Sequence, residues 1–73
     1  MMEVREAVLT VLAEEAVPLH WTRIQDLALR RGYVDPFSTP DVRKRVLAEL
    51  AAAVRAGELR KDGTGVYALA AER

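Results

Sequence analysis

The 73-residue chain has no cysteine and no asparagine, and His20 is its only histidine. Without cysteine it has neither a disulfide framework nor a thiolate metal site, and one histidine cannot assemble a histidine-based metal site alone. No apolar run is long enough to span a bilayer. Glu3 and Glu6 stand where a signal peptide would be basic. We therefore expect a cytoplasmic protein with no metal or other cofactor and no membrane partner.

Glutamine occurs once, and arginine far outnumbers lysine. Few amide residues can accompany heat tolerance, but a GC-rich prokaryotic genome would give the same bias. With 51% hydrophobic and 30% charged residues, the chain has the composition of a globular protein. Its length predicts a single small domain over residues 1–73, either a minimal stand-alone protein or a piece of a larger one.

The zero formal net charge hides an uneven distribution along the chain. Residues 1–19 carry one arginine against four glutamates, a net charge of −3. Residues 20–45 carry six cations against three aspartates, a net charge of +3, and residues 46–73 balance. A neutral total argues against strong non-specific attachment to a polyanion, whereas a basic middle segment permits a local patch.

The pattern of residues 39–69 predicts a helix followed by a two-stranded β-wing. Thr39 suits a helix cap and Pro40 the first helical position. Apolar residues at helical spacing predict one buried face, made of Val42, Val46, Leu47, Leu50 and Val54. Gly57 is a left-handed helix stop. Two short strands around the turn at 62–65 then predict a hairpin.

Two further helices are expected before this segment, over residues 3–14 and from about residue 21 to Gly32. The extended stretch 17–19 is a candidate third strand beside the wing. Tyr33, Val34 and Phe37 should hold the following loop against the domain. Together these elements predict an α+β, mainly α fold: a winged helix-turn-helix of three helices and a C-terminal wing.

Several short segments carry a resemblance to a known family: residues 17–24, Arg31-Gly32-Tyr33-Val34, Thr39-Pro40 and Gly65-Val66-Tyr67-Ala68-Leu69. They resemble the HARE-HTH family, winged helix-turn-helix modules of the bacterial RNA polymerase delta subunit, Additional-sex-combs-like chromatin proteins and restriction endonuclease fusions. Arg43, Lys44 and Leu59 depart from the family pattern. The resemblance implies DNA association for many members and protein docking for others.

The candidate DNA-binding residues lie on the third helix, on the wing and on the second helix. Lys44 and Arg45 are the first candidates, since residues near the start of this helix reach bases or phosphates in most DNA-binding members of the architecture. Arg43 lies nearer the apolar side, where its stem would pack or pair with a carboxylate. The other candidates are Arg55, Arg60, Lys61, Thr64 and Arg23.

Each candidate also has a purely structural interpretation. The helix cations could form a solvated surface, and Arg23 could pair with Asp26 as readily as with a phosphate. His20 is expected to hydrogen-bond the backbone at the helix start, and Trp21 to anchor the core. Nothing in the sequence arranges a nucleophile, base and orienting residue, so we expect no enzymatic activity and no small-molecule substrate.

Two functions follow as hypotheses. The first is a DNA-binding winged-helix module that acts in transcription or targets a DNA-acting protein, with double-stranded DNA as its partner. The second is a docking module without direct DNA contact, bound to RNA polymerase or to a second copy of itself. The neutral net charge and the alanines Ala48, Ala51 and Ala52 on the third helix motivate this second hypothesis.

Overall fold

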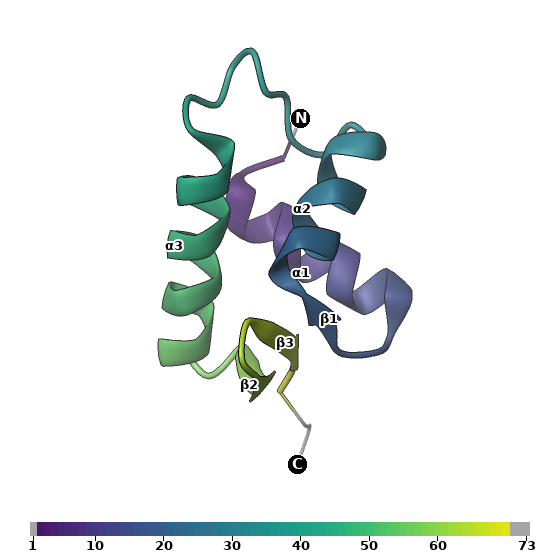
Figure 1. Ribbon diagram of the computed structural model, residues 1–73, viewed down its shortest axis with the longest axis vertical. Helices are drawn as coiled ribbons and strands as arrows, with labels where there is room; N and C mark the ends of the chain where they lie inside the picture. The colour runs from purple at the N-terminus through teal and green to yellow at the C-terminus, as the bar shows by residue number, and fades with distance from the viewer. Residues whose placement is uncertain (1, 71–73) are drawn as a thin grey trace.

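Three helices precede a C-terminal hairpin in the computed structural model, which describes residues 2–70 (Figure 1). The elements in chain order are α1 (Val4–Glu15), β1 (Leu19–His20), α2 (Trp21–Arg30), α3 (Val42–Arg55), β2 (Leu59–Gly63) and β3 (Val66–Leu69). This order gives the domain an α+β, mainly helical, winged-helix-like fold. The predicted fold class is confirmed.

The three strands form one antiparallel sheet in the order β1-β3-β2. Leu19 of β1 lies opposite Tyr67, so the candidate third strand exists, although it covers Leu19–His20 rather than residues 17–19. The hairpin is longer than predicted, because β2 continues to Gly63 through an irregularity after Lys61. Only Thr64 and Gly65 lie between the two strands of the wing.

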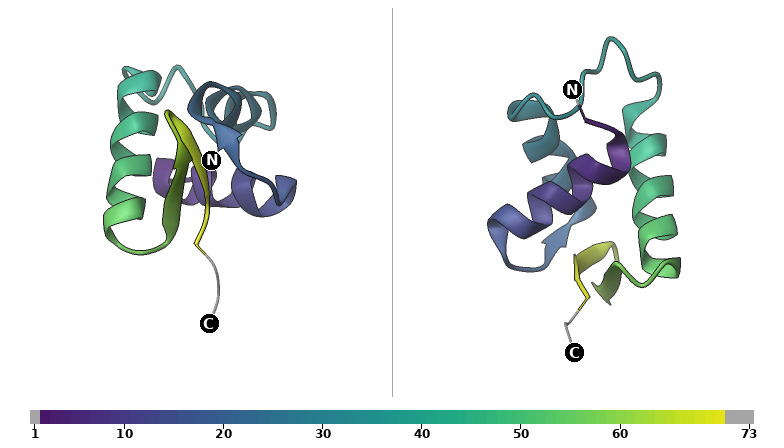
Figure 2. Two further views of the ribbon diagram at one scale, coloured as in Figure 1. Left: turned by 60° about the horizontal axis from the view of Figure 1, so that its bottom comes forward. Right: turned by 180° about the vertical axis from the view of Figure 1, so that it is seen from behind.

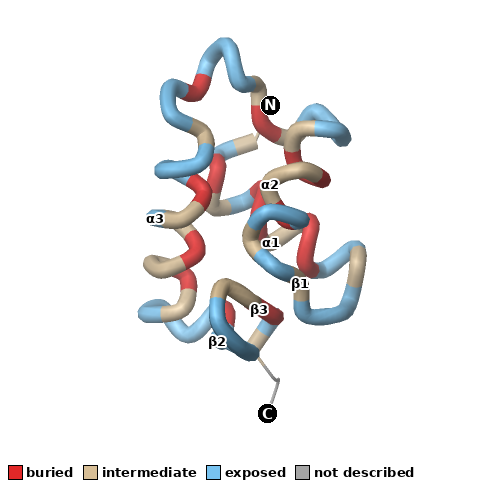
Figure 3. Tube along the Cα trace, viewed as in Figure 1, coloured by how far each residue is buried: buried red, intermediate tan, exposed pale blue. Residues whose placement is uncertain are grey.

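The hydrophobic core lies where the three helices meet above the sheet (Figure 3). α1 passes behind α2 and α3 in Figure 1 and lies in front when the domain is seen from behind (Figure 2). α3 buries Val46, Leu50 and Ala53 completely. The predicted apolar face is therefore correct at its centre, whereas Val42 and Val54 at its ends are only half-buried.

Two helix boundaries follow the sequence signals. His20 is the N-cap of α2, and its Nδ1 accepts a hydrogen bond from the backbone N–H of Thr22 at 3.3 Å. This confirms the expected structural role of His20, because the bond satisfies one of the free N–H groups of the first helical turn. α3 ends at Arg55, and Gly57 follows it with a φ of +82°.

The predicted start of α3 is wrong. The helix begins at Val42, and its N-cap is Asp41, which has a left-handed φ of +53° and no side-chain capping bond. Thr39 and Pro40 belong instead to a turn organised by Asp35, whose backbone carbonyl accepts the N–H of Thr39 at 3.0 Å. A local aspartate turn competes with the helix for these residues.

The expected packing of the loop before α3 is only partly correct. Val34 is buried and Tyr33 is half-buried, as predicted, but Phe37 is 98% exposed. The carboxylate of Asp35 accepts the backbone N–H of Phe37 at 3.0 Å and the Ser38 hydroxyl at 2.9 Å. The turn is therefore held by polar contacts of Asp35, and Phe37 contributes nothing to its packing.

Candidate nucleic-acid interface

The first turn of α3 carries three consecutive cations, Arg43, Lys44 and Arg45, and all three are exposed. Their positions follow from the core, because burial of Val46 and Leu50 fixes the rotation of the helix about its axis. Consecutive helical residues point in different directions. The three cations therefore face different neighbours.

Arg43 faces α2. Its guanidinium carbon lies 5.9 Å from the centre of the Trp21 ring, within the range of a cation–π contact. The expectation that Arg43 packs near the apolar side is confirmed, and its partner is an aromatic ring rather than a carboxylate. Among the described residues Arg43 has no ion pair, so its charge is not neutralised within residues 2–70.

Arg45 faces α1. Its Nη2 lies 3.4 Å from the carboxylate of Glu49, and Glu49 also accepts the Nε of Arg5 of α1 at 2.8 Å. Residues four apart share one side of a helix, so Arg45 and Glu49 both lie on the α1 side. Arg45 is thus exposed, as predicted, but it points away from α2 and its charge is partly compensated.

Lys44 lies between these two directions and forms no ion pair with any residue in the range 2–70. Together with Arg43, Asp41 and Leu47 it lines a shallow hollow at the start of α3. Arg55 is exposed in the last turn of α3, roughly 16 Å along the axis from Lys44. Arg55 therefore lies at the opposite end of the helix.

The wing cations have different environments. Arg60 pairs with Asp62, two residues further along β2. The Lys61 ammonium lies 5.7 Å from the centre of the Tyr67 ring, and no carboxylate of the described residues pairs with it. Thr64 is exposed at the tip of the hairpin. Lys61 is therefore the wing cation whose charge is left for an outside partner.

The wing tip is tied to the start of α2. The backbone N–H of Trp21 donates to the carbonyl of Gly65 at 2.9 Å. The His20 ring lies so close to Gly65 that a Cβ atom on this glycine would come within 2.9 Å of His20 Nε2. Sequence reasoning assigned Gly65 to the turn alone and missed this contact, because only the β1–β3 pairing brings the two residues together.

On α2, the alternative interpretation of Arg23 describes its observed contact. Arg23 pairs with Asp26 at 3.3 Å, and Arg30 pairs with the same carboxylate at 2.9 Å. One aspartate thus faces two arginines, and this exposed cluster retains a net positive charge. Exposed pairs of this kind add little to stability.

Of the chemically reactive side chains, Ser38 and Asp35 are bonded to each other, whereas His20 is bonded elsewhere. Ser38 donates to Asp35, and the His20 ring is hydrogen-bonded to the Thr22 hydroxyl at 2.8 Å. The structure therefore does not join Ser38, His20 and Asp35 into one site. Across residues 2–70 no three acidic or imidazole groups gather where a metal ion could bind.

The Arg5–Glu49 pair gives the domain a specific acid sensitivity. The hydrogen bond from Arg5 is the main reason that the pKa of Glu49 lies below its usual value near 4.5. A carboxyl group with a lowered folded pKa contributes stability above its unfolded pKa, and this contribution is lost as the pH falls through the folded pKa. We expect Glu49→Gln to flatten the fall in unfolding free energy below about pH 4.5, measured by urea unfolding.

The matched control for this experiment is Glu6→Gln, because Glu6 lies on α1 and pairs with no cation in the described part of the chain. Below about pH 4.5, the unfolding free energy of Glu6→Gln should fall with pH as that of the wild type does. If the unfolding free energies of wild type and Glu49→Gln fell equally as the pH is lowered, the role of the Arg5–Glu49 bond would be contradicted.

A scan against protein-family models and searches of curated proteins and solved structures return no match to this chain. None of the helices within residues 2–70 has the length and apolar character needed to cross a membrane. The class that the structure defines is thus a winged-helix-like domain, and its function has to be argued from the surfaces described above.

Proposed function

We propose that the domain binds double-stranded DNA through the start of α3, with the wing supplying further phosphate contacts. One observation carries the proposal: Arg43 and Lys44 are adjacent, exposed and free of ion pairs within residues 2–70, in the first turn of α3. In DNA-binding helix-turn-helix proteins the corresponding end of this helix enters the major groove. The resemblance to the HARE-HTH family supports the same function.

The contacts of the cations divide them into two groups. Arg43, Lys44 and Lys61 have no carboxylate partner in the described chain, so phosphate groups would not have to displace one. Arg23, Arg45 and Arg60 pair with carboxylates of their own elements, and Arg55 lies at the far end of α3. We infer that the first group provides most of the electrostatic binding. Thr64 would add a neutral contact at the wing tip.

The test is a salt titration of binding to a random-sequence duplex, followed by fluorescence anisotropy. Each phosphate neutralised by a cation contributes about 0.9 to the slope of log K against log salt. The double substitution Arg43→Ala with Lys44→Ala should therefore lower the slope by about 1.8 and weaken binding by about tenfold or more at low salt. Circular dichroism of each variant verifies that it is folded.

Arg45→Ala is the matched control, since Arg45 lies in the same turn but pairs with Glu49 on the α1 side. It should change the slope much less than the double substitution. If folded wild-type protein shows no duplex binding at low salt, the proposal fails. A concentration-dependent dimer in sedimentation, insensitive to DNA, would then favour docking through Ala48, Ala51 and Ala52 of α3.

A further inference from the structure

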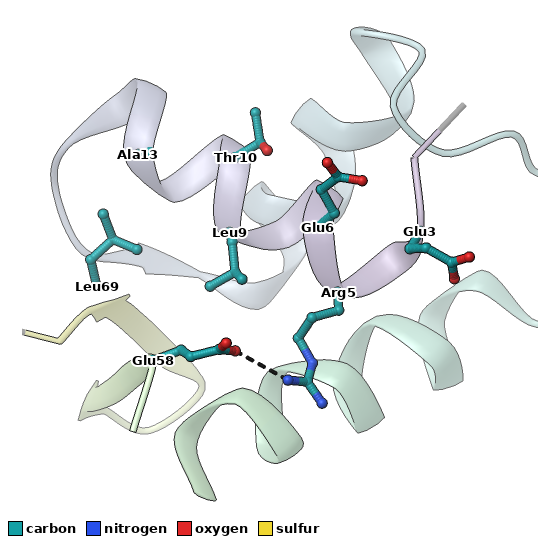
Figure 4. Close-up of a pocket in the computed structure, with 8 residues that line it drawn as sticks. All are labelled: Glu3, Arg5, Glu6, Leu9, Thr10, Ala13, Glu58 and Leu69. Atoms are coloured by element: carbon teal, nitrogen blue, oxygen red, sulfur yellow. Dashed lines mark hydrogen bonds and ion pairs between the residues drawn. The ribbon is translucent and has the colours of Figure 1, made fainter. Parts of the chain in front are cut away.

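The large hydrophobic side chains left exposed in residues 2–70 are Val17, Phe37 and Leu69. Two of them belong to one surface. Leu69 lines a shallow groove together with Leu9, Thr10 and Ala13 of α1, and it also lines an adjoining hollow that contains Val17. We call the first of these the α1–wing groove; its lining side chains are labelled in Figure 4.

The α1–wing groove uses the side of α1 opposite its buried stripe, where Leu9 alone also packs against the core. Glu6, Leu9, Thr10 and Ala13 lie at positions i, i+3, i+4 and i+7, so they form one stripe along the helix. The buried stripe of α1 lies on the other side and contains Val4, Ala7, Val8, Val11 and Leu12. α1 therefore carries a second strip, apolar at Leu9 and Ala13, which lines the groove together with Leu69 of the wing.

The rim of the groove is negatively charged. Glu3 and Glu6 form no ion pair with any described residue, and Glu58 lies on the wing side. The one cation of the rim is Arg5, which pairs with Glu58 at 3.1 Å (Figure 4). It is also engaged with Glu49 at 2.8 Å. A partner for this groove therefore needs apolar side chains flanked by positive charge.

We propose that the α1–wing groove binds a basic amphipathic helix of another protein. Helix-in-groove recognition uses apolar anchors at i, i+3 or i+4, and i+7. The strip from Glu6 to Ala13 extends roughly 10 Å along α1, enough for two turns of a partner helix. A second copy of the chain is a poor occupant, since its own α1 would bring Glu3 and Glu6 against the same charges.

This proposal is independent of DNA binding. The groove shares no lining residue with the hollow formed by Asp41, Arg43, Lys44 and Leu47. α1 also lies on the back of the domain in Figure 1, behind α2 and α3. A bound helix would therefore leave the candidate DNA surface open, so the domain could hold both partners at once.

The experiment is a selection from a displayed library of random helical peptides against the wild-type domain. The expected binders have apolar residues at helical spacing flanked by lysine or arginine. When such a peptide binds, the largest changes in the amide chemical shifts of the domain should occur at residues 6–13 and Leu69. Leu69→Ser should weaken the selected peptide by about tenfold. Phe37→Ser is the matched control because Phe37 is exposed but lies outside the groove, and it should bind like the wild type.

The charge requirement is tested by an isosteric pair. Glu6→Gln should weaken the selected peptide by roughly two- to threefold, as expected for an exposed ion pair. Asp41→Asn also removes one negative charge, but outside the groove, and should leave the affinity for the selected peptide unchanged. Ala13→Arg, at an exposed helical position, blocks the groove if Leu69→Ser does not fold. Binders without basic flanks, or binding unaffected by Leu69→Ser and Ala13→Arg, would overturn the proposal.

Discussion

Leu50→Ala is expected to remove a large share of the stability of the domain. Leu50 is completely buried in the middle of α3, between the helices and the wing. Truncating a buried leucine to alanine costs about 2–5 kcal/mol, from lost burial and from the cavity left behind. A chain of this size has a total stability of roughly 4–11 kcal/mol. Since each kcal/mol shifts the Tm of a domain of this size by about 4–8 °C, thermal unfolding followed by circular dichroism should show a fall of roughly 8–40 °C in Tm.

Leu47→Ala is the matched control, since it removes the same atoms from the same helix at a half-exposed position. Its cost should stay below about 1 kcal/mol, because little apolar surface returns to water. Equal losses of stability for the two variants would mean that α3 does not pack on the core through the face that carries Leu50.

The regular elements could be predicted from the sequence because their signals are local. The apolar spacing of Val4, Val8 and Val11 defines α1, and Gly57 marks the end of α3. The start of α3 could not be predicted in this way. Thr39-Pro40 is a good helix-start pattern, but Asp35 binds the backbone of residues 37–39 in a competing turn.

Phe37 shows a different limit of prediction from the sequence. Apolar residues in a loop favour burial, but exposure of single apolar side chains is common in folded proteins. Here Asp35 holds the backbone of the turn without burial of the ring, which stays 98% exposed.

The candidate site shows what a helical wheel omits. The wheel correctly ranks Lys44 and Arg45 as outward and Arg43 as nearer the apolar side. It contains the i, i+4 pair of Arg45 and Glu49, but not the neighbouring elements. It therefore could not predict that Arg5 of α1 also pairs with Glu49, or that Arg43 meets Trp21 of α2. The structure thus leaves Arg43 and Lys44, rather than Lys44 and Arg45, as the adjacent cations without a carboxylate partner.

Gly65→Ala is expected to cost about 2–3 kcal/mol through two separate effects. Gly65 has a φ of +71°, a conformation that costs an L-residue about 1–2 kcal/mol. Its new Cβ would also approach His20 Nε2 to 2.9 Å. The ring cannot move away freely, because its Nδ1 caps α2 through Thr22, and losing such a cap costs about 1 kcal/mol. Urea unfolding measures the total.

Gly32→Ala separates the two effects, since Gly32 has a nearly identical φ of +73° and open space around the site of its Cβ. It should show the backbone cost alone. In a His20→Ser background the cap is retained by serine and the ring is gone, so Gly65→Ala should there cost less than in the wild type. Any excess over Gly32→Ala that remains would come from Trp21 Cδ1, which the new Cβ would approach to 3.2 Å. An unchanged cost of Gly65→Ala in that background would mean that the wing tip does not press on the histidine. The wing would then be positioned by the backbone bond between Trp21 and Gly65, by the β1–β3 pairing and by burial of Leu59 and Tyr67 in the core.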